Sequence, residues 1–288
     1  MRAPALFWLA RLRLWTAEWP AANAHLDEAV RLSRDAGLPG TLAISLGKRG
    51  WIASHQGRPL QEASSFVDEA VATARPLGED WTLAEVLNDL GAILSNDPEL
   101  RPAGSAAFRE ALELRRRLGD AQNVIDSLNN LANIDMYDGR FDEAERGFRE
   151  CYELACGLGE RRHQTLTGAN LGMTLVLLGR AGEAWPLLEE TAALSLSCGD
   201  RRMGGATLTV LAAVSAVEGN TLDAARLWGA GITVKNTGPI PDDDLIWESV
   251  LVEARDALGP AVFDAAIDEG KSLGFEDAVL LARSDAVR

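Results

Sequence analysis

The feature that most constrains the fold of this chain is a repeat of about forty residues. Five glycines recur at spacings of 41, 41, 40 and 40 residues, and all but the first precede an acidic residue: Gly37, Gly78, Gly119, Gly159 and Gly199. A second glycine marker falls between them: Gly57, Gly139, Gly179 and Gly219, with the stretch "NDPELRP" filling the missing place. Self-similarity at this period indicates an array of stacked structural repeats.

Between the markers, apolar residues follow a helical period. Val124, Leu128 and Leu131 fall on one face of a helix, and Phe141, Ala144 and Phe148 continue at steps of three and four. Each unit is therefore expected to be two antiparallel helices of about four turns. Glycines such as Gly139 end a helix where the backbone turns left-handed. We expect Asp120 and Asp200 to cap the helices that follow them.

Three positions of the repeat carry side chains of fixed size. A small residue stands where the two helices would cross: Ala10, Gly50, Gly91, Ala132, Gly172 and Ala212. A second small residue lies on the second helix: Ala22, Ala63, Ala144, Ala184 and Ala224. A large apolar residue follows it: Leu26, Val67, Phe108, Phe148, Leu188 and Trp228. A bulky side chain at the first position would push the helices apart, so the pattern predicts close crossing.

The order small residue, turn glycine, aromatic, small residue, large residue resembles the tetratricopeptide repeat. The period alone would also fit HEAT or armadillo repeats, and the usual tetratricopeptide period is 34, so these units have longer helices. The resemblance implies an all-α, right-handed α-solenoid of six helical hairpins over residues 1–235. Their expected bounds are about 1–38, 39–78, 79–118, 119–158, 159–198 and 199–235. Pro102 suits the first turn of its helix, whereas Pro186 implies a helix that starts late or kinks.

The repeat stops after residue 235. We expect residues 236–288 to form a Pro/Gly linker and a capping segment of three helices, at 242–258, 260–270 and 274–284, because a solenoid needs its last apolar face covered. From about residue 119 to the end, "AARLWGAG…PIPDDDLIWESV" and its surroundings resemble the C-terminal part of bacterial LuxR-type and maltose-regulator-like signal-transduction ATPases. That resemblance implies a sensor or scaffold arm in transcriptional control.

Composition excludes several classes of partner. The net charge of −15 disfavours nucleic acid and anionic membrane surfaces, and no stretch approaches the ~20 apolar residues of a membrane span. The start of the chain is read as an amphipathic helix rather than a signal peptide, because Arg11 and Arg13 interrupt it. Three cysteines without a CxxC pair indicate reduced thiols in a cytoplasmic protein, each buried as a small apolar residue: Cys151, Cys156 and Cys198.

No residue pattern predicts an enzyme, a cofactor or a metal site. "LGKRG" lacks the spacing of a phosphate-binding loop, and "GAG" at 229–231 is an isolated fragment. His25, His55 and His163 lie far apart and are expected on the surface or in a groove. Asp242–Asp244 is read as a solvated helix N-terminus.

The resemblance implies that the first helix of each hairpin lines a concave groove for a protein, a peptide or a small effector. Its residues by register are Arg11, Trp15, Lys48, Trp51, His55, Asn88, Asn129, Asn133, Tyr137, Asn170 and Met173. Asn side chains both donate and accept, so they suit an extended peptide backbone. Alternatively, Asn130 and Asn170 bond to neighbouring helices and only stabilise the stack. The Lys and Asn set with which the family binds a terminal carboxylate is missing.

The first helix carries more apolar side chains than one partner helix can cover. Phe7, Trp8, Leu12 and Trp19, with Trp15, are expected to form an edge that binds another domain or a second copy of the chain. Two functions follow as hypotheses. The first is a non-catalytic binding scaffold or sensor; the second is a self-association module whose groove binds no ligand.

Overall fold

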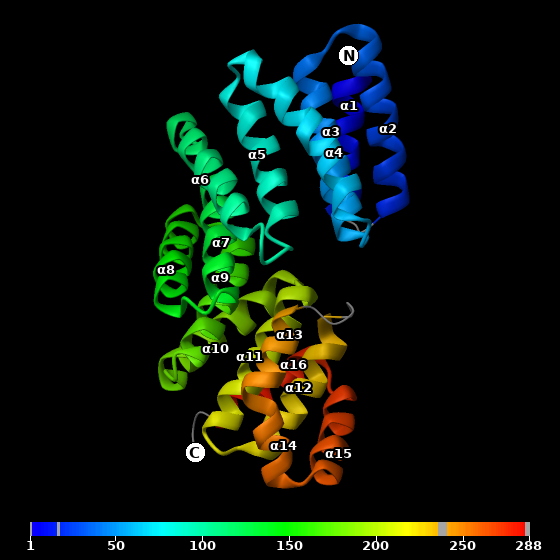
Figure 1. Cartoon of the computed structure of the whole chain (residues 1–288). Coiled ribbons are helices and arrows are strands. Elements are labelled where there is room, and N and C mark those ends of the chain that lie inside the picture. Colours follow the sequence, from blue (N-terminus) through cyan, green and yellow to red (C-terminus); the bar gives the residue numbers. More distant parts are fainter. Residues whose placement is uncertain (1, 16–17, 236–240, 286–288) are drawn as a thin grey trace. The chain divides into compact units, whose positions relative to one another are not determined.

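The computed structural model describes residues 2–15, 18–235 and 241–285, and within these ranges every regular element is a helix. This confirms the predicted all-α fold class. The chain divides into two compact units, Met1–Ile134 and Asp135–Arg288, which are described separately. Figure 1 labels the helices of both units.

The first unit consists of helical hairpins. Its helices are α1 (Arg2–Trp15), α2 (Trp19–Ala36), α3 (Pro39–His55), α4 (Leu60–Ala74), α5 (Asp80–Leu94), α6 (Arg101–Leu118) and α7 (Ala121–Tyr137), with a 3-10 turn at Arg75–Leu77. The last residues of α7 belong to the second unit. Helices pair in chain order, α1 with α2, α3 with α4 and α5 with α6, and each pair packs on the next.

The second unit continues the pairing and then departs from it. Its helices are α8 (Phe141–Leu158), α9 (Arg161–Leu177), α10 (Ala181–Cys198), α11 (Arg201–Val217), α12 (Thr221–Lys235), α13 (Pro241–Ile246), α14 (Val252–Leu258), α15 (Pro260–Lys271) and α16 (Phe275–Asp285). A π-helical stretch, Trp247–Leu251, joins α13 to α14, where the sequence predicted one uninterrupted helix. Most of the predicted linker, residues 236–240, lies outside the described residues.

The turn glycines and the aspartate caps behave as predicted. All nine glycines of the two markers have positive φ, for example 74° at Gly139. A left-handed residue after the last helical turn lets the chain reverse, and glycine adopts it without a steric penalty. The Oδ1 atom of Asp200 accepts a hydrogen bond from the Met203 amide at 3.0 Å, and Asp120 accepts one from the Asn123 amide at 3.3 Å. These caps satisfy amides that have no partner within the helix.

The small residues at the helix crossings allow the predicted close approach. A Cβ atom on Gly50 would lie 2.7 Å from the carbonyl oxygen of Ala63, and one on Gly172 would lie 2.4 Å from the side chain of Leu188. At Gly91 the same atom would meet the Phe108 ring at 2.7 Å. The facing residues Ala63, Leu188 and Phe108 all lie at the positions of the second helix where the sequence predicted a small or a large apolar residue. The sizes at these positions therefore set the distance between paired helices.

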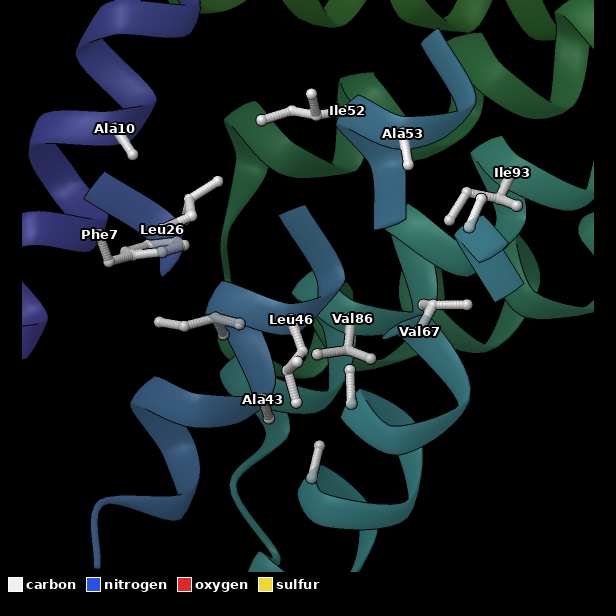
Figure 2. Packing of buried hydrophobic residues seen from close by; sticks show 14 of the residues in the cluster. Phe7, Ala10, Leu26, Ala43, Leu46, Ile52, Ala53, Val67, Val86 and Ile93 are labelled. Carbon is white, nitrogen blue, oxygen red and sulfur yellow. The ribbon is translucent and has the colours of Figure 1, made fainter. Parts of the chain in front are cut away.

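The core of the first unit runs from hairpin to hairpin. Figure 2 shows buried side chains of one hydrophobic cluster that come from successive helices, including Phe7, Leu26, Leu46, Val67 and Ile93. A single hairpin would leave this cluster open on at least one side. Burial is therefore shared between neighbours, as expected for a repeat array.

After α12, the C-terminal helices pack through glycines. A Cβ atom on Gly229 would lie 2.1 Å from the carbonyl oxygen of Ile267, and one on Gly270 would lie 2.0 Å from that of Arg226, so α12 and α15 are in backbone contact. Trp247 packs against Trp228 with ring centroids 5.3 Å apart. This packing supports the proposal that the segment after α12 caps the array.

Several local expectations were wrong. Cys156 and Cys198 are exposed and only Cys151 is buried, because the first two lie in the last turns of α8 and α10, beyond the buried stripe. His163 is buried, which contradicts the surface position, one of the two alternatives given for it. Of the two alternatives given for Pro186, the late start is wrong, since α10 begins at Ala181 and Pro186 lies inside it.

The substitution Phe148→Ala tests whether neighbouring hairpins share a core in the second unit as well. Phe148 is fully buried, so removing its ring should lower the free energy of unfolding by about 3–5 kcal/mol through the cavity it leaves. Because repeats couple mainly to neighbours, unfolding in urea should separate into two phases. Leu158→Ala, at an exposed position of α8, is the control and should change stability by less than about 0.5 kcal/mol. A melt of Phe148→Ala identical to that of the wild type would contradict the shared core.

Candidate functional site

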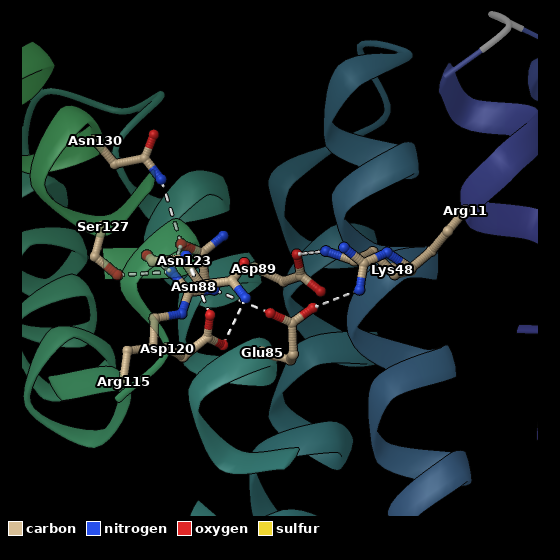
Figure 3. Close-up of polar contacts among 10 residues, drawn as sticks. All are labelled: Arg11, Lys48, Glu85, Asn88, Asp89, Arg115, Asp120, Asn123, Ser127 and Asn130. Atoms are coloured by element: carbon tan, nitrogen blue, oxygen red, sulfur yellow. Dashed lines mark hydrogen bonds and ion pairs between the residues drawn. The ribbon is translucent and has the colours of Figure 1, made fainter. Parts of the chain in front are cut away.

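A buried ionic network lies on the face formed by the first helices of the first three hairpins. Glu85 and Asp89 stand one turn apart on α5 and point toward α1 and α3 (Figure 3). Glu85 accepts from Arg11 of α1 at 3.2 Å, and Asp89 accepts from Lys48 of α3 at 2.6 Å. These contacts tie α1, α3 and α5 together through side chains that lie far apart in the sequence.

Arg115 of α6 extends the network to α7. Its guanidinium group donates to Glu85 Oε1 at 3.0 Å, to Ser127 Oγ at 2.6 Å and to the carbonyl oxygen of Asn123 at 3.0 Å. It also donates to Asn88 Oδ1 at 3.0 Å. The same oxygen accepts a hydrogen bond from Asn130 Nδ2 at 3.3 Å. The planar fork of arginine suits such multiple contacts, so Arg115 is held between α5 and α7 while almost fully buried.

Burial and nearby charges shift the pKa values of the two carboxylates in opposite directions. Burial acts to raise the pKa of Glu85, but Lys48, Arg115 and Arg11 together outweigh it and lower the pKa below its usual range. Burial also raises the pKa of Asp89, and there Lys48 does not fully offset it, while the charge of Glu85 adds to the rise. Asp89 is 1% exposed, and its Oδ2 atom accepts no hydrogen bond from the residues described.

A partly exposed cluster of aromatic side chains borders the network. The indole of Trp8 on α1 is half exposed, the Arg11 guanidinium group lies 5.1 Å from its centroid, and the Trp81 ring of α5 lies 6.1 Å away. A cation over an indole face is an attractive contact. Since Arg11 also binds Glu85, the buried network fixes the position of this surface. Trp8, Arg11 and Trp81 are called the Trp8 cluster below.

A second aromatic stack joins α2 to the end of α3. The rings of Trp19 and Trp51 stack with centroids 5.8 Å apart, and the His55 ring lies 3.8 Å from that of Trp51. Trp19 is thus half-buried against α3, and Phe7 is fully buried in the core. Among the described side chains of the predicted association edge, Trp8 and Leu12 are exposed, whereas Phe7 and Trp19 are not.

The predicted groove residues divide into several groups. Arg11, Lys48 and Asn88 meet in the ionic network, and Trp51 and His55 in the aromatic stack. Asn129 is buried, Asn133 is half-buried and Tyr137 is exposed, all on α7. The side chain of Trp15 lies outside the described residues.

In the second unit the corresponding face is covered by the chain itself. Asn170 and Met173 of α9 line a cavity of about 20 Å³ with Ala206, Thr209 and Val210 of α11, and Ile246 of α13 forms its remaining wall. The volume is close to that of one water molecule. Ile246 therefore covers this part of α9 and α11, whereas Trp8 in the first unit is half exposed.

Sequence reasoning did not identify Glu85, Asp89, Arg115 or Trp81. The signal was present in "AEVLND", where two acidic residues four apart interrupt an otherwise buried helix. No group of His, Cys, Asp and Glu suited to a metal ion occurs in the described ranges. None of the described helices is both long and apolar enough to cross a bilayer.

Comparison with known proteins confirms the resemblance to the tetratricopeptide repeat. Residues 124–157, from α7 into α8, match the tetratricopeptide repeat family. No curated protein matches the chain significantly. The fold defines a protein of helical hairpins of the tetratricopeptide type.

Solved structures of other proteins share this fold. The chain is similar to a signal transduction ATPase with numerous domains, which has a tetratricopeptide repeat sensor, from Pyrococcus horikoshii: TM-score 0.65 and 13% identity over 93% of this chain and 43% of that one. It is also similar to BtubC from P. vanneervenii, with a TM-score of 0.60 and 20% identity over 77% and 92%. It is similar as well to aspartyl phosphate phosphatase F from Bacillus subtilis, with a TM-score of 0.62 and 10% identity over 94% of this chain and 70% of that one. The chain spans less than half of the first of these.

Glu85→Gln and Asp89→Asn should change stability with opposite dependence on pH. The lowered pKa of Glu85 means that its ionised form stabilises the fold above about pH 4.3, the ordinary value, and that this stabilisation is lost as the pH falls. Near neutral pH, Glu85→Gln should cost about 3 kcal/mol or more, because it leaves buried cations unpaired. The raised pKa of Asp89 means that its contribution is present below about pH 3.9 and is lost as the pH rises through the folded pKa.

Urea unfolding at pH values from about 2 to about 8 measures both effects, because the Glu85 contribution changes mainly below about pH 4.3 and the Asp89 contribution above about pH 3.9. The difference in the free energy of unfolding between the wild type and Glu85→Gln should grow as the pH rises. The corresponding difference for Asp89→Asn should shrink. Glu110→Gln breaks an exposed pair with Arg75 and should cost less than about 1 kcal/mol. If both differences change in the same direction with pH, the opposite pKa shifts assigned to Glu85 and Asp89 are wrong.

Proposed function

We propose that this chain is a non-catalytic sensor or scaffold that binds a protein or peptide segment on the Trp8 cluster of its first unit. The observation that carries the proposal is an exposed Trp and a neighbouring Arg held in fixed positions by a buried ionic network. Trp and Arg dominate the binding energy of protein interfaces. A surface whose side chains are already immobilised loses less entropy on binding.

The network supports binding rather than catalysis. Glu85 and Asp89 are the side chains of this face that could serve as acid or base, but both are buried and engaged by cations. A general base must reach its substrate within hydrogen-bonding distance. Their role in this proposal is to position Arg11 and to hold α1, α3 and α5 together.

The biological setting is proposed from the sequence resemblance together with one fold relative. The likeness over 93% of this chain to a signal transduction ATPase with a tetratricopeptide repeat sensor supports a sensor arm. We infer a bacterial, cytoplasmic role in transcriptional regulation of the LuxR-type or maltose-regulator-like kind. In that role the arm receives a partner protein, a peptide or a small effector and involves no nucleic-acid contact of its own.

Peptide selection tests the binding surface even while the natural partner is unidentified. A phage-displayed library of random peptides is panned on the wild-type chain, and enriched peptides are titrated by calorimetry against Trp8→Ala. Loss of a hot-spot Trp should weaken binding about 30-fold, which corresponds to about 2 kcal/mol. Trp8 is half exposed, so its removal should leave the thermal melt nearly unchanged.

Leu154→Ala, an exposed apolar position on α8 of the other unit, is the matched control and should bind like the wild type. Peptides that bind Trp8→Ala and the wild type equally would exclude the Trp8 cluster as the binding site.

A further inference from the structure

The exposed edge of the buried ionic network carries positive charge. Helix α1 contains three arginines, α3 contains Lys48 and Arg49, and neither helix contains an acidic residue, although the chain as a whole has a net charge of −15. The carboxylates on the same face, Glu85 and Asp89, are buried. The side chain of Arg11 is 29% exposed and that of Lys48 is 16% exposed. A ligand that approaches this face therefore meets cations first.

The charges of the network do not cancel. Glu85 is shared, because it accepts from Arg11 at 3.2 Å and from Arg115 at 3.0 Å. Lys48 binds Asp89 at 2.6 Å. Three cations thus face two carboxylates, a net charge of +1, and among the described residues no further carboxylate forms an ion pair with these cations. Since salt screens more distant charges over about 8 Å, the local excess decides which ligand this face attracts.

Asp89 is the group of the network whose charge can change. Its Oδ1 atom accepts from Lys48, whereas its Oδ2 atom accepts no hydrogen bond from the described residues and lies against Gly47, where a Cβ atom would be 2.9 Å away. A buried carboxylate with one unpaired oxygen is unfavourable, and protonation relieves this. Burial accordingly raises the pKa of Asp89, while Lys48 and Arg11 act against the rise. The charge of Glu85 adds to it.

The charge balance at Asp89 is set within the network. The charged groups that act on it are Lys48 of α3, Glu85 of α5 itself and Arg11 of α1, and Arg115 of α6 contacts Glu85. Helix α4 also packs on α5. The acidic residues of α4 lie in exposed ion pairs or in solvent: Glu62, Asp68 and Glu69.

We propose that binding of an acidic peptide segment at the Trp8 cluster is coupled to the uptake of a proton from solvent by the Asp89 carboxylate. With Asp89 neutral, the same side chains carry a net charge of +2, and Lys48 loses its carboxylate partner. A peptide carboxylate then pairs with Lys48 or Arg11 at the exposed edge and compensates the added charge. The coupling is reciprocal, so the peptide favours the proton as much as the proton favours the peptide. It presupposes the binding surface proposed above and adds the chemical class of the ligand.

Calorimetry in buffers of different ionisation enthalpy measures the proton directly, because the difference in binding enthalpy gives the number of protons taken up. The probes are the peptides enriched by panning on the wild-type chain, and copies in which every Glu and Asp is replaced by Gln and Asn. Between about pH 8 and about pH 5, the wild type should bind the acidic peptides about 5-fold or more tightly as the pH falls, and should take up a fraction of one proton. The amide copies should bind more weakly and take up none.

Two variants assign the proton to its site. Asp89→Asn removes the titrating group and keeps a neutral side chain of similar shape, so its affinity for the acidic peptides should no longer depend on pH and no proton should be taken up. Glu110→Gln, at an exposed acidic position of α6, is the matched control and should retain the uptake of the wild type. Circular dichroism checks that both variants fold, and the comparison of each peptide with its amide copy on the wild-type chain needs no variant.

The outcomes separate this coupling from the binding surface on which it depends. Peptides that lose affinity for Trp8→Ala, but bind the wild type without proton uptake or as tightly in their amide form, would overturn the coupling and leave the surface intact. Proton uptake that persists in Asp89→Asn would place the proton on another group and overturn it as well. Panning that enriches no peptide, or peptides that bind Trp8→Ala like the wild type, would exclude the surface and the coupling together.

Discussion

The close crossing of paired helices at Ala and Gly positions is the contact on which the rest of the structure depends. At Gly50 the neighbouring backbone carbonyl oxygen is so near that no larger side chain fits without a shift. Because the two helices of a hairpin cross closely, the buried side chains of both helices contact the next hairpin. The hydrophobic core is therefore continuous from one hairpin to the next. Close crossing also sets α1, α3 and α5 beside one another, which makes a shared surface from helices that are about forty residues apart in sequence.

The ionic network is a second constraint, added to the first. Burying charges is costly, and a hydrophobic core would have served stability as well or better. What the network provides is a fixed relation between α1, α3, α5 and α6, because Glu85 must meet cations from both sides. Arg11 connects the buried network to the exposed surface, since its guanidinium group contacts both the Glu85 carboxylate and the Trp8 ring. Fold and candidate binding surface are thus linked through one side chain.

Much of the fold could be predicted from the sequence because its signals are local and repeated. The turn at Gly139, the cap at Asp200 and the small residue at Gly172 each depend on spacing within one hairpin, and six hairpins repeat the pattern in phase. The network could not be predicted in the same way. Arg115 and Glu85 are thirty residues apart, and their contact depends on how two helices rotate about their axes. Register placed Lys48 and Asn88 on the right face, but it did not reveal that this face is partly occupied by the protein's own charges.

The C-terminal segment shows the same limit. Its three helical stretches were expected from Gly and Pro positions, whereas the π-helical stretch at Trp247–Leu251 and the placement of Ile246 over Met173 depend on tertiary packing. Cys156 and Cys198 were misjudged because a preference for burial does not say where the buried stripe of a helix ends. Local preferences fix the elements, and contacts between hairpins decide which faces remain open.

The most direct test of the account compares one substitution at a crossing with the same substitution at an open helical position. Gly50 lies against the backbone of Ala63, whereas a Cβ atom on Gly157 of α8 would meet no atom within 4 Å among the described residues. Gly50→Leu should lower the free energy of unfolding by about 1–3 kcal/mol or more, because the paired helices must separate. Gly157→Leu should raise it by up to about 1 kcal/mol, since leucine favours a helix more than glycine does. If urea titration shows that both variants are as stable as the wild type, or that both gain, close crossing does not hold this fold together.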